Sequence, residues 1–375
     1  MKKIRLIKIL GVQVNLHWTF TLLIAWILVV QMANGAGMAQ VMWALLGIAA
    51  IFTCVVLHEL GHVLVAAYYH IKTRSITLYP IGGLAIMEKL PGRPVEEMLI
   101  SLAGPLVNLV IAALLLPFIP YYVPFWKTAV IINNIQPGNL LLYLHTINIM
   151  LALFNLIPAF PLDGGRVLRG LLGLFLHNGR PTAIAILTGR IIAAAFIITG
   201  LFSFNLLLPF IGVLIILADA AEEQLVYLRT AVKGIKLREF IIRDYTTIPH
   251  NLSIQATAAE FLPGRHQYFV ITSPQGMAGV TDRNTLLHAL AQGWHHKPVA
   301  ALISAPPKTL DENSLADEVV EQLVQQRTAA LPVMCGNRLA GILNLDSIIE
   351  YLLIHDTSAK TQNQRGAVAR MLQQF

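Results

Sequence analysis

Long runs of apolar residues recur through the first 220 positions, and polar residues return after them. A helix needs about 20 mostly apolar residues to cross a bilayer. Runs of this kind occur six times before the pattern changes. We therefore predict an α-helical polytopic membrane protein with six spans, at approximately 16–32, 39–69, 97–118, 140–157, 182–201 and 205–221.

The polar C-terminal part contains an internal repeat. The stretch MAGVTDRNTLLHAL (277–290) matches LAGILNLDSIIEYL (339–352) in its pattern of apolar positions. Each copy predicts a short strand, a helix, two strands and a second helix. The sequence thus predicts four parts: a membrane domain (1–221), a linker (222–238), an α/β domain made of two repeats (239–355) and a polar tail (356–375).

Two segments next to the apolar runs have patterns of their own. The basic start, MKKIRLIK, leads into an apolar run without a small-residue cleavage site, so we interpret it as the start of a retained first span rather than a signal peptide. The segment 71–96 has alternating and β-branched residues around Gly82 and Gly83, which predicts a β-hairpin or a re-entrant segment. A substrate could bind there by strand addition, which makes these two glycines candidate substrate-binding residues.

Composition agrees with a membrane protein. Of the 375 residues, 56% are hydrophobic and only 13% are charged, against about 25% charged in a typical soluble domain. The formal charge of +7 needs no nucleic-acid partner, because cationic loops on the cytoplasmic side of the bilayer supply such an excess. The two cysteines, Cys54 and Cys335, are far apart, and they indicate neither a disulfide framework nor a cysteine zinc site.

The basic residues also predict the orientation in the cell membrane. They gather in the loops 70–96 and 158–181 and in the region after 221, whereas the loops on the opposite side hold only Lys127. Because basic loops stay in the cytoplasm, we expect both termini and the α/β domain to be cytoplasmic in this multi-pass chain.

The second apolar run contains the sequence His58-Glu59-Leu60-Gly61-His62. On a helix, residues four apart share a face, so the two imidazoles could bind one zinc ion, with Glu59 beside the activated water as a general base. The five-residue pattern also arises by chance in soluble chains. In a membrane helix, however, each ionisable group costs roughly 2.5–3.5 kcal/mol and is functional by default, which favours a zinc site.

A zinc site of this kind needs a third protein ligand. The candidate is Asp163 in NLIPAFPLDGGR (155–166), at the cytoplasmic end of the fourth predicted span, where prolines break the helix. The second and fourth spans run in the same direction, which places Asp163 at the depth of the two histidines. Asn155, an amide in an apolar run, could bind a substrate backbone or a neighbouring helix.

These motifs resemble the site-2 protease family, the intramembrane zinc metalloproteases, and more closely its branch with C-terminal CBS repeats, which includes the sporulation protease of Gram-positive bacteria. The resemblance is carried by HELGH, AGPLVN (103–108) and NLIPAFPLDGG. It implies that His58, His62 and Asp163 bind one zinc ion per chain and that Glu59 is catalytic. It also implies that Asn155 and Pro158 help to position a single-span membrane protein as substrate.

The two C-terminal copies resemble CBS motifs, which often pair and bind adenine nucleotides. The family's ribose-binding pattern is degraded at one position in each copy: Gly341–Asp346 keeps Asp346 but loses the hydroxyl residue, and Gly279–Asn284 keeps Thr281 but loses the aspartate. The resemblance therefore leaves two alternatives, a nucleotide site that uses these two residues and a structural role that includes homodimer formation.

The competing function is a membrane transporter or channel regulated by a CBS pair, because polar residues in spans and CBS repeats occur there too. Two histidines and an aspartate around one point make a closed site rather than an ion pathway, which favours the protease. A catalytically silent scaffold is a third alternative, and the intact Glu59 argues against it.

Overall fold

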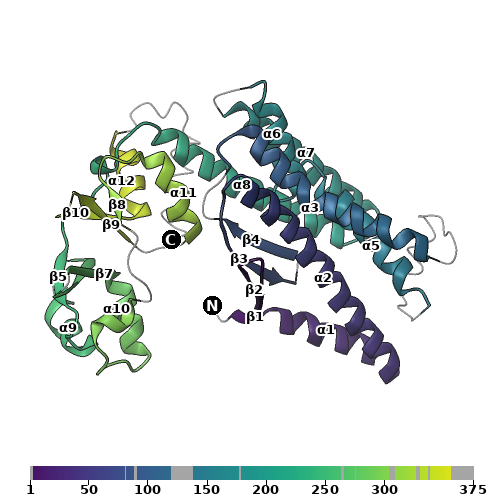
Figure 1. Ribbon diagram of the computed structural model, residues 1–375, viewed down its shortest axis with the longest axis horizontal. Helices are drawn as coiled ribbons and strands as arrows, with labels where there is room; N and C mark the ends of the chain where they lie inside the picture. Colours follow the sequence, from purple (N-terminus) through teal and green to yellow (C-terminus); the bar gives the residue numbers. More distant parts are fainter. Residues whose placement is uncertain are drawn as a thin grey trace. The chain divides into compact units, whose positions relative to one another are not determined.

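The computed structural model describes residues 3–80, 82–87, 91–119, 138–176, 179–262, 266–274, 276–303, 309–326, 330–336 and 338–355. The chain forms two compact units, Met1–Glu223 and Gln224–Phe375 (Figure 1). Each unit is described by itself. Lys127, on which part of the orientation argument depends, and the predicted polar tail lie outside the described residues.

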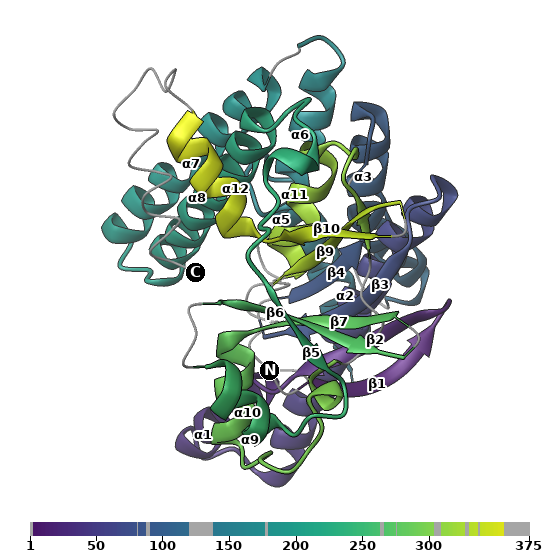
Figure 2. The ribbon, with the colours of Figure 1, turned by 90° about the vertical axis from the view of Figure 1, so that its left-hand side faces the viewer.

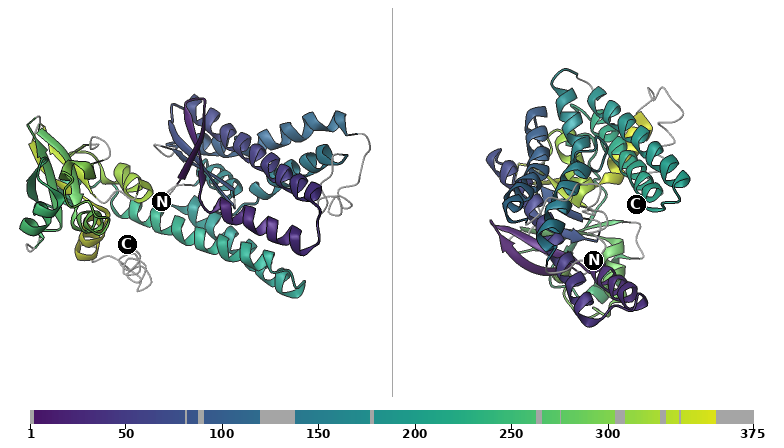
Figure 3. Two further views of the ribbon diagram at one scale, coloured as in Figure 1. Left: turned by 90° about the horizontal axis from the view of Figure 1, so that it is seen from below. Right: turned by 90° about the vertical axis from the view of Figure 1, so that its right-hand side faces the viewer.

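The first unit is mainly helical. Its helices are α1 (Phe20–Ala33), α2 (Met38–Tyr68), α3 (Pro94–Leu115) with the short 3-10 turn η1 (Leu116–Phe118), α5 (Leu140–Asn155), α6 (Asp163–Gly173), α7 (Arg180–Phe202) and α8 (Leu207–Ala231), the last of which continues into the second unit. Glycines on both α7 and α8 allow these two helices to pack side by side (Figure 3).

Three helices in the described part of the chain are long and apolar enough to cross a membrane: α2, α3 with η1, and α7. The prediction of six spans is therefore not confirmed. Helices α1 and α5 are apolar but have only 14 and 16 residues. Helix α8 is apolar in its first half and then carries Asp219, Glu222 and Glu223.

A four-stranded sheet stands beside these helices, in the order β1 (Lys3–Ile9), β2 (Val12–His17), β3 (Thr73–Tyr79) and β4 (Gly82–Met87). Neighbouring strands are antiparallel except β2 and β3, which are parallel. The hairpin predicted within 71–96 is confirmed. The predicted start of the first span is wrong, because residues 12–17 form a strand and the basic N-terminal stretch forms its partner.

The local sequence explains this strand pair. Val12, Val14 and Leu16 alternate with polar residues, and a period of two is the signature of a strand with one buried face. Between the strands, Leu10 and Gly11 both have positive φ, at 50° and 82°, as two-residue hairpin turns require.

The sheet packs against α2. Val12 and Val14 of β2 and Ile76 and Leu78 of β3 form one buried core with Val55, Leu60 and Val63 of α2. On another side, α2 lies very close to α3 at Gly61. A Cβ added at Gly61 would stand only 2.8 Å from the Ala103 carbonyl oxygen. The middle of α2 is therefore enclosed between the sheet and α3.

The second unit contains two copies of one small fold (Figure 2). The first copy runs β5 (Thr246–Pro249), α9 (Ile254–Phe261), β6 (Tyr268–Ser273), β7 (Gly276–Asp282) and α10 (Arg283–Ala291). The second runs β8 (Leu310–Asp311), α11 (Ala316–Gln326), β9 (Leu331–Cys335), β10 (Arg338–Leu343) and α12 (Leu345–His355). Each copy has a three-stranded sheet and its own buried core, which confirms the predicted repeat.

Candidate metal centre

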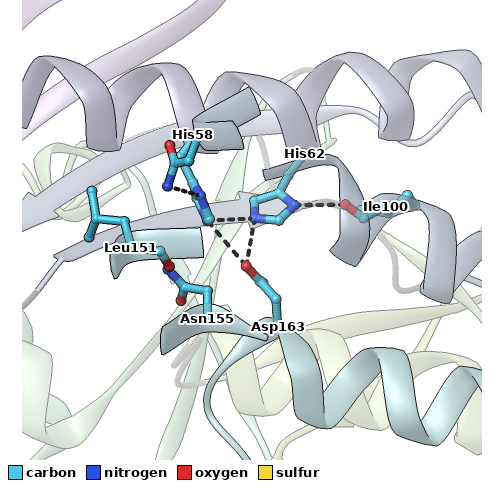
Figure 4. A network of polar contacts seen from close by, with 7 residues as sticks. His58, His62, Ile100, Leu151, Asn155 and Asp163 are labelled. Carbon is cyan, nitrogen blue, oxygen red and sulfur yellow. Dashed lines mark hydrogen bonds and ion pairs between the residues drawn. The ribbon is translucent and has the colours of Figure 1, made fainter. Parts of the chain in front are cut away.

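Two histidines of α2 meet an aspartate that lies about a hundred residues further along the chain (Figure 4). His58 and His62 lie one turn apart on α2, and Asp163 is the first residue of α6. His58 Nε2 lies 3.1 Å from His62 Nε2 and 3.1 Å from Asp163 Oδ2, and His62 Nε2 lies 3.2 Å from the same oxygen. The three atoms thus form a nearly equilateral triangle.

The triangle has the dimensions of one face of a zinc site. Ligand bonds of about 2.0–2.1 Å in a tetrahedron separate the ligand atoms by about 3.3 Å. Two imidazoles and a carboxylate are ordinary zinc ligands, and three of them leave the fourth position open. The residues present therefore fit a zinc ion with one free coordination position.

The carboxylate has the charge state of a metal ligand. Burial opposes the charged form of Asp163, but His62 and His58 beside it outweigh that effect and hold the pKa of its carboxyl group well below the ordinary value. Its place at the start of α6 also favours a negative charge, since the helix dipole is positive there.

Each imidazole has a polar partner behind it on α3. His62 Nδ1 lies 2.7 Å from the carbonyl oxygen of Ile100, and His58 Nδ1 lies 3.2 Å from the side-chain amide of Asn108. Gly104, between these two positions on α3, lies so close to the rings that a Cβ there would meet the Nε2 atoms of both. These contacts fix the direction of both rings.

Glu59, the predicted catalytic residue, is buried beside the predicted substrate-binding hairpin. A Cβ added at Gly83 of β4 would stand 2.7 Å from Glu59 Oε1. The structure thus brings together two residues that the sequence had assigned to different roles. Gly82 precedes Gly83 at the start of β4 and has φ of +145°, in the region that favours glycine.

The turn that carries Asp163 is packed tightly. A Cβ at Gly164 would meet the carbonyl oxygens of Leu156 and Ile157, and one at Gly165 would stand 2.8 Å from the Phe160 nitrogen. The two glycines therefore serve close approach of α6 to the preceding turn. The turn also contains Pro158, which is half-buried.

Asn155, the other predicted substrate-binding residue, is the last residue of α5. Its amide donates to the Leu151 carbonyl oxygen of the same helix, at 2.9 Å (Figure 4). The contact lies within α5, so the structure shows neither of the two partners expected for this amide, a substrate backbone or a neighbouring helix. The amide oxygen is not engaged by it.

An ion cluster behind the turn was not predicted from the sequence. The Arg169 guanidinium of α6 pairs with Glu97 of α3 and Glu222 of α8, and it lies 5.1 Å from the centre of the Phe160 ring. Burial opposes its charge, but Glu222 and Glu97 outweigh that effect and raise the pKa of Arg169. The cluster ties three helices to the turn before Asp163.

The predicted nucleotide-binding residues lie in the second unit. Thr281 is buried on β7, and its hydroxyl group has no partner among the described residues. Asp346 lies in the first turn of α12, 3.3 Å from the amide nitrogen of Asn344, which also bonds to the Tyr268 hydroxyl of the first copy. Thr281 thus lies near the end of β7, and Asp346 lies just after β10, the equivalent strand of the second copy.

Comparisons with known proteins identify the family. The model of peptidase family M50 matches residues 46–199, and the CBS domain model matches residues 299–354. A zinc metalloprotease of Methanocaldococcus jannaschii is 32% identical over 355 residues, which are 94% of this chain and 96% of that protein. The chain belongs to peptidase family M50. It is a zinc metalloprotease of the site-2 type with a C-terminal CBS pair, and a membrane protein.

Two further proteins are similar to parts of this chain. Stage IV sporulation protein FB of Bacillus subtilis is 30% identical over 117 residues, which are 30% of this chain and 36% of that protein. The solved structure of the site-2 protease from M. jannaschii is 37% identical, with a TM-score of 0.45, and the match covers 59% of this chain and 95% of that chain. Membership in this family favours a protease over the transporter alternative.

Proposed function

We propose that this protein is an intramembrane zinc endopeptidase that cleaves single-span membrane proteins in or near their membrane-spanning segment. In this proposal, His58, His62 and Asp163 hold one zinc ion per chain and Glu59 is the general base. The observation that carries the proposal is the triangle of three ligand atoms, with sides of 3.1–3.2 Å, one residue away from a buried glutamate.

Zinc bound at this site supplies Lewis-acid polarisation of the scissile carbonyl and activation of water. Glu59 takes the proton of the attacking water and passes it to the leaving amine. Its position directly after His58 keeps it beside the ligand face, and the contact with Gly83 limits the space in which its carboxylate can move.

A substrate must present an extended backbone to this site. Strand β4 is an edge of the sheet in the described part of the chain, and an edge strand binds an extended peptide by backbone hydrogen bonds. We propose that an unwound substrate segment adds to β4 beside Gly82 and Gly83. The Asn155 amide oxygen and the turn at Pro158 then contact its backbone from the other side.

The charge pattern and the C-terminal unit extend the proposal. Basic residues predominate in the loops assigned to the cytoplasm, so we place both termini and the CBS pair there in a multi-pass chain, which opens the site to water from that side. The CBS pair regulates cleavage by binding an adenine nucleotide at Thr281 and Asp346, or by forming a homodimer.

The test is cleavage of candidate single-span proteins co-expressed with the wild type or Glu59→Gln. The amide keeps the size of the side chain but cannot accept a proton, so we expect cleavage to fall by at least the 10²-fold typical of a lost general base, with zinc content unchanged. Cleavage by Glu59→Gln at the wild-type rate would show that the proposed mechanism is wrong. Zinc content that is unchanged in His58→Ala would reject the site.

A further inference from the structure

The polar groups behind the two imidazoles lie on one face of α3. Ile100, Gly104 and Asn108 follow each other at intervals of four residues, so they form a single stripe along the helix. Ile100 contacts His62, Asn108 contacts His58, and Gly104 lies against both rings. One stripe of α3 therefore matches the two histidines of α2 position by position.

The two contacts differ in kind. A backbone carbonyl can only accept a hydrogen bond, so the Ile100 contact at 2.7 Å requires a proton on His62 Nδ1 and leaves the lone pair on Nε2. An asparagine amide can turn either its nitrogen or its oxygen toward a ring. Asn108 has its Nδ2 atom 3.2 Å from His58 Nδ1, while its buried Oδ1 has no partner among the described residues.

We propose that Asn108 is a positioning residue that holds His58 as a ligand, with its amide oxygen accepting a hydrogen bond from His58 Nδ1. The inference rests on the zinc site proposed above. With the amide turned this way, both histidines donate from Nδ1 to acceptors on α3 and direct the lone pairs of Nε2 toward the same point.

The gain from this arrangement lies in the amide oxygen and in the tautomer of His58. Asn108 is fully buried, and a buried polar atom without a partner costs roughly 1–3 kcal/mol. Turning the amide gives Oδ1 a donor and also fixes the tautomer of His58. Partners of this kind behind metal-binding histidines commonly change metal affinity by about 10–100-fold when they are removed.

The experiment measures zinc affinity in the full chain, purified in detergent and titrated with a zinc chelator, with bound zinc counted by mass spectrometry. Asn108→Leu and the smaller truncation Asn108→Ala remove the acceptor. Asn108→Asp keeps an oxygen acceptor of similar shape. We expect the two truncations to weaken zinc binding by about 10–100-fold. We expect Asn108→Asp, which keeps the acceptor, to bind zinc with an affinity close to that of the wild type.

Asn148 of α5 offers a matched control. It is also fully buried, and its amide donates to Cys54 Sγ at 3.2 Å and to the Leu144 carbonyl oxygen at 2.8 Å. Asn148→Leu therefore removes a buried amide from the same helical unit, without removing a contact to a histidine ligand. We expect its zinc affinity to stay near that of the wild type.

Three results would overturn the inference: wild-type zinc affinity in both truncations, equal zinc loss in Asn148→Leu, or equal zinc loss in Asn108→Asp. Measuring His58→Ala in the same series separates this failure from that of the proposed site. Zinc lost in His58→Ala but kept in the Asn108 truncations contradicts only the role of Asn108, whereas zinc kept in His58→Ala contradicts the site itself.

Discussion

Gly83 of β4 lies directly against the side chain of Glu59: a Cβ at this position would stand 2.6 Å from Glu59 Cγ and 2.7 Å from Oε1. Contacts this short between carbon and its neighbours are far inside van der Waals distance. The Glu59 side chain can therefore keep its position beside β4 only because residue 83 is a glycine.

The first prediction concerns this contact. Gly83→Ala should displace the Glu59 carboxylate and lower proteolytic activity by at least tenfold, since misplacement of a reacting group by about 1 Å can cost 10²-fold. Zinc content should stay at the wild-type level, because Gly83 touches the base and not the proposed ligands. The measurements are initial cleavage rate and zinc per chain.

The control for this prediction is Gly92→Ala. A Cβ at Gly92 has nothing within 4 Å, so the substitution changes glycine to alanine without a steric conflict. Equal activities of the two variants would contradict the proposed importance of the contact between β4 and Glu59.

That His58 and His62 share one helix face could be predicted from the sequence, because their spacing is local. Two histidines four residues apart must share a helix face, and a carboxylate after a proline-broken helix is an available third ligand. The hairpin around Gly82 and Gly83 was also predicted, since strand alternation is a local signal. The role of these glycines beside Glu59 was not, because it depends on which helix the hairpin covers.

The strands β1 and β2 were missed although their signal was present. The basic residues at the N-terminus indicated the start of a span, and this outweighed the alternation through Val12, Val14 and Leu16. The contacts of Asn108 and Arg169 could not be predicted in this way. Each depends on the packing of helices that are far apart in the sequence, and a single chain carries no local pattern for such pairs.

A second prediction concerns Gly104. Gly104→Ala should push both imidazoles away from their common point, because the added Cβ would meet the Nε2 atoms of His58 and His62. We expect a clear loss of bound zinc, measured per chain after dialysis. Gly37→Ala is the control, since Gly37 at the start of α2 has open space around its Cβ position. Full zinc occupancy in Gly104→Ala would contradict the geometry.

A third prediction concerns the ion cluster behind the turn of Asp163. Arg169→Met should destabilise the first unit by about 3–5 kcal/mol, because it leaves Glu97 and Glu222 without the cation that compensates their burial. The measurement is unfolding in detergent, followed by helical circular dichroism against denaturant.

Arg93→Gln provides the comparison for Arg169. Arg93 pairs with Glu96 at 3.9 Å, but its side chain is 84% exposed, and exposed pairs contribute only about 0–1 kcal/mol. If the two substitutions shift the unfolding midpoint equally, the cluster at Arg169 has no special role in holding α6.

A fourth prediction separates substrate binding from metal binding at Asn155. Its amide nitrogen is used within α5, which leaves its oxygen for a substrate N–H group. Asn155→Ala should therefore weaken substrate binding and raise KM, with zinc content unchanged. A fall in zinc content together with activity would instead show that Asn155 supports the metal centre.

The last prediction tests the CBS pair as a nucleotide site. An aspartate that bonds to a ribose contributes roughly 1.5–3 kcal/mol as a charged acceptor, so Asp346→Ala should weaken binding of AMP or ATP to the full chain by about 10–100-fold. Thr281→Val should weaken it less, because a neutral hydroxyl contributes only about 1 kcal/mol. Glu350→Gln, an exposed charge removed from the same helix, should leave binding unchanged. Nucleotide binding by Asp346→Ala at the wild-type level would contradict this site, and a wild type that binds neither nucleotide would favour a structural role of the CBS pair that includes homodimer formation.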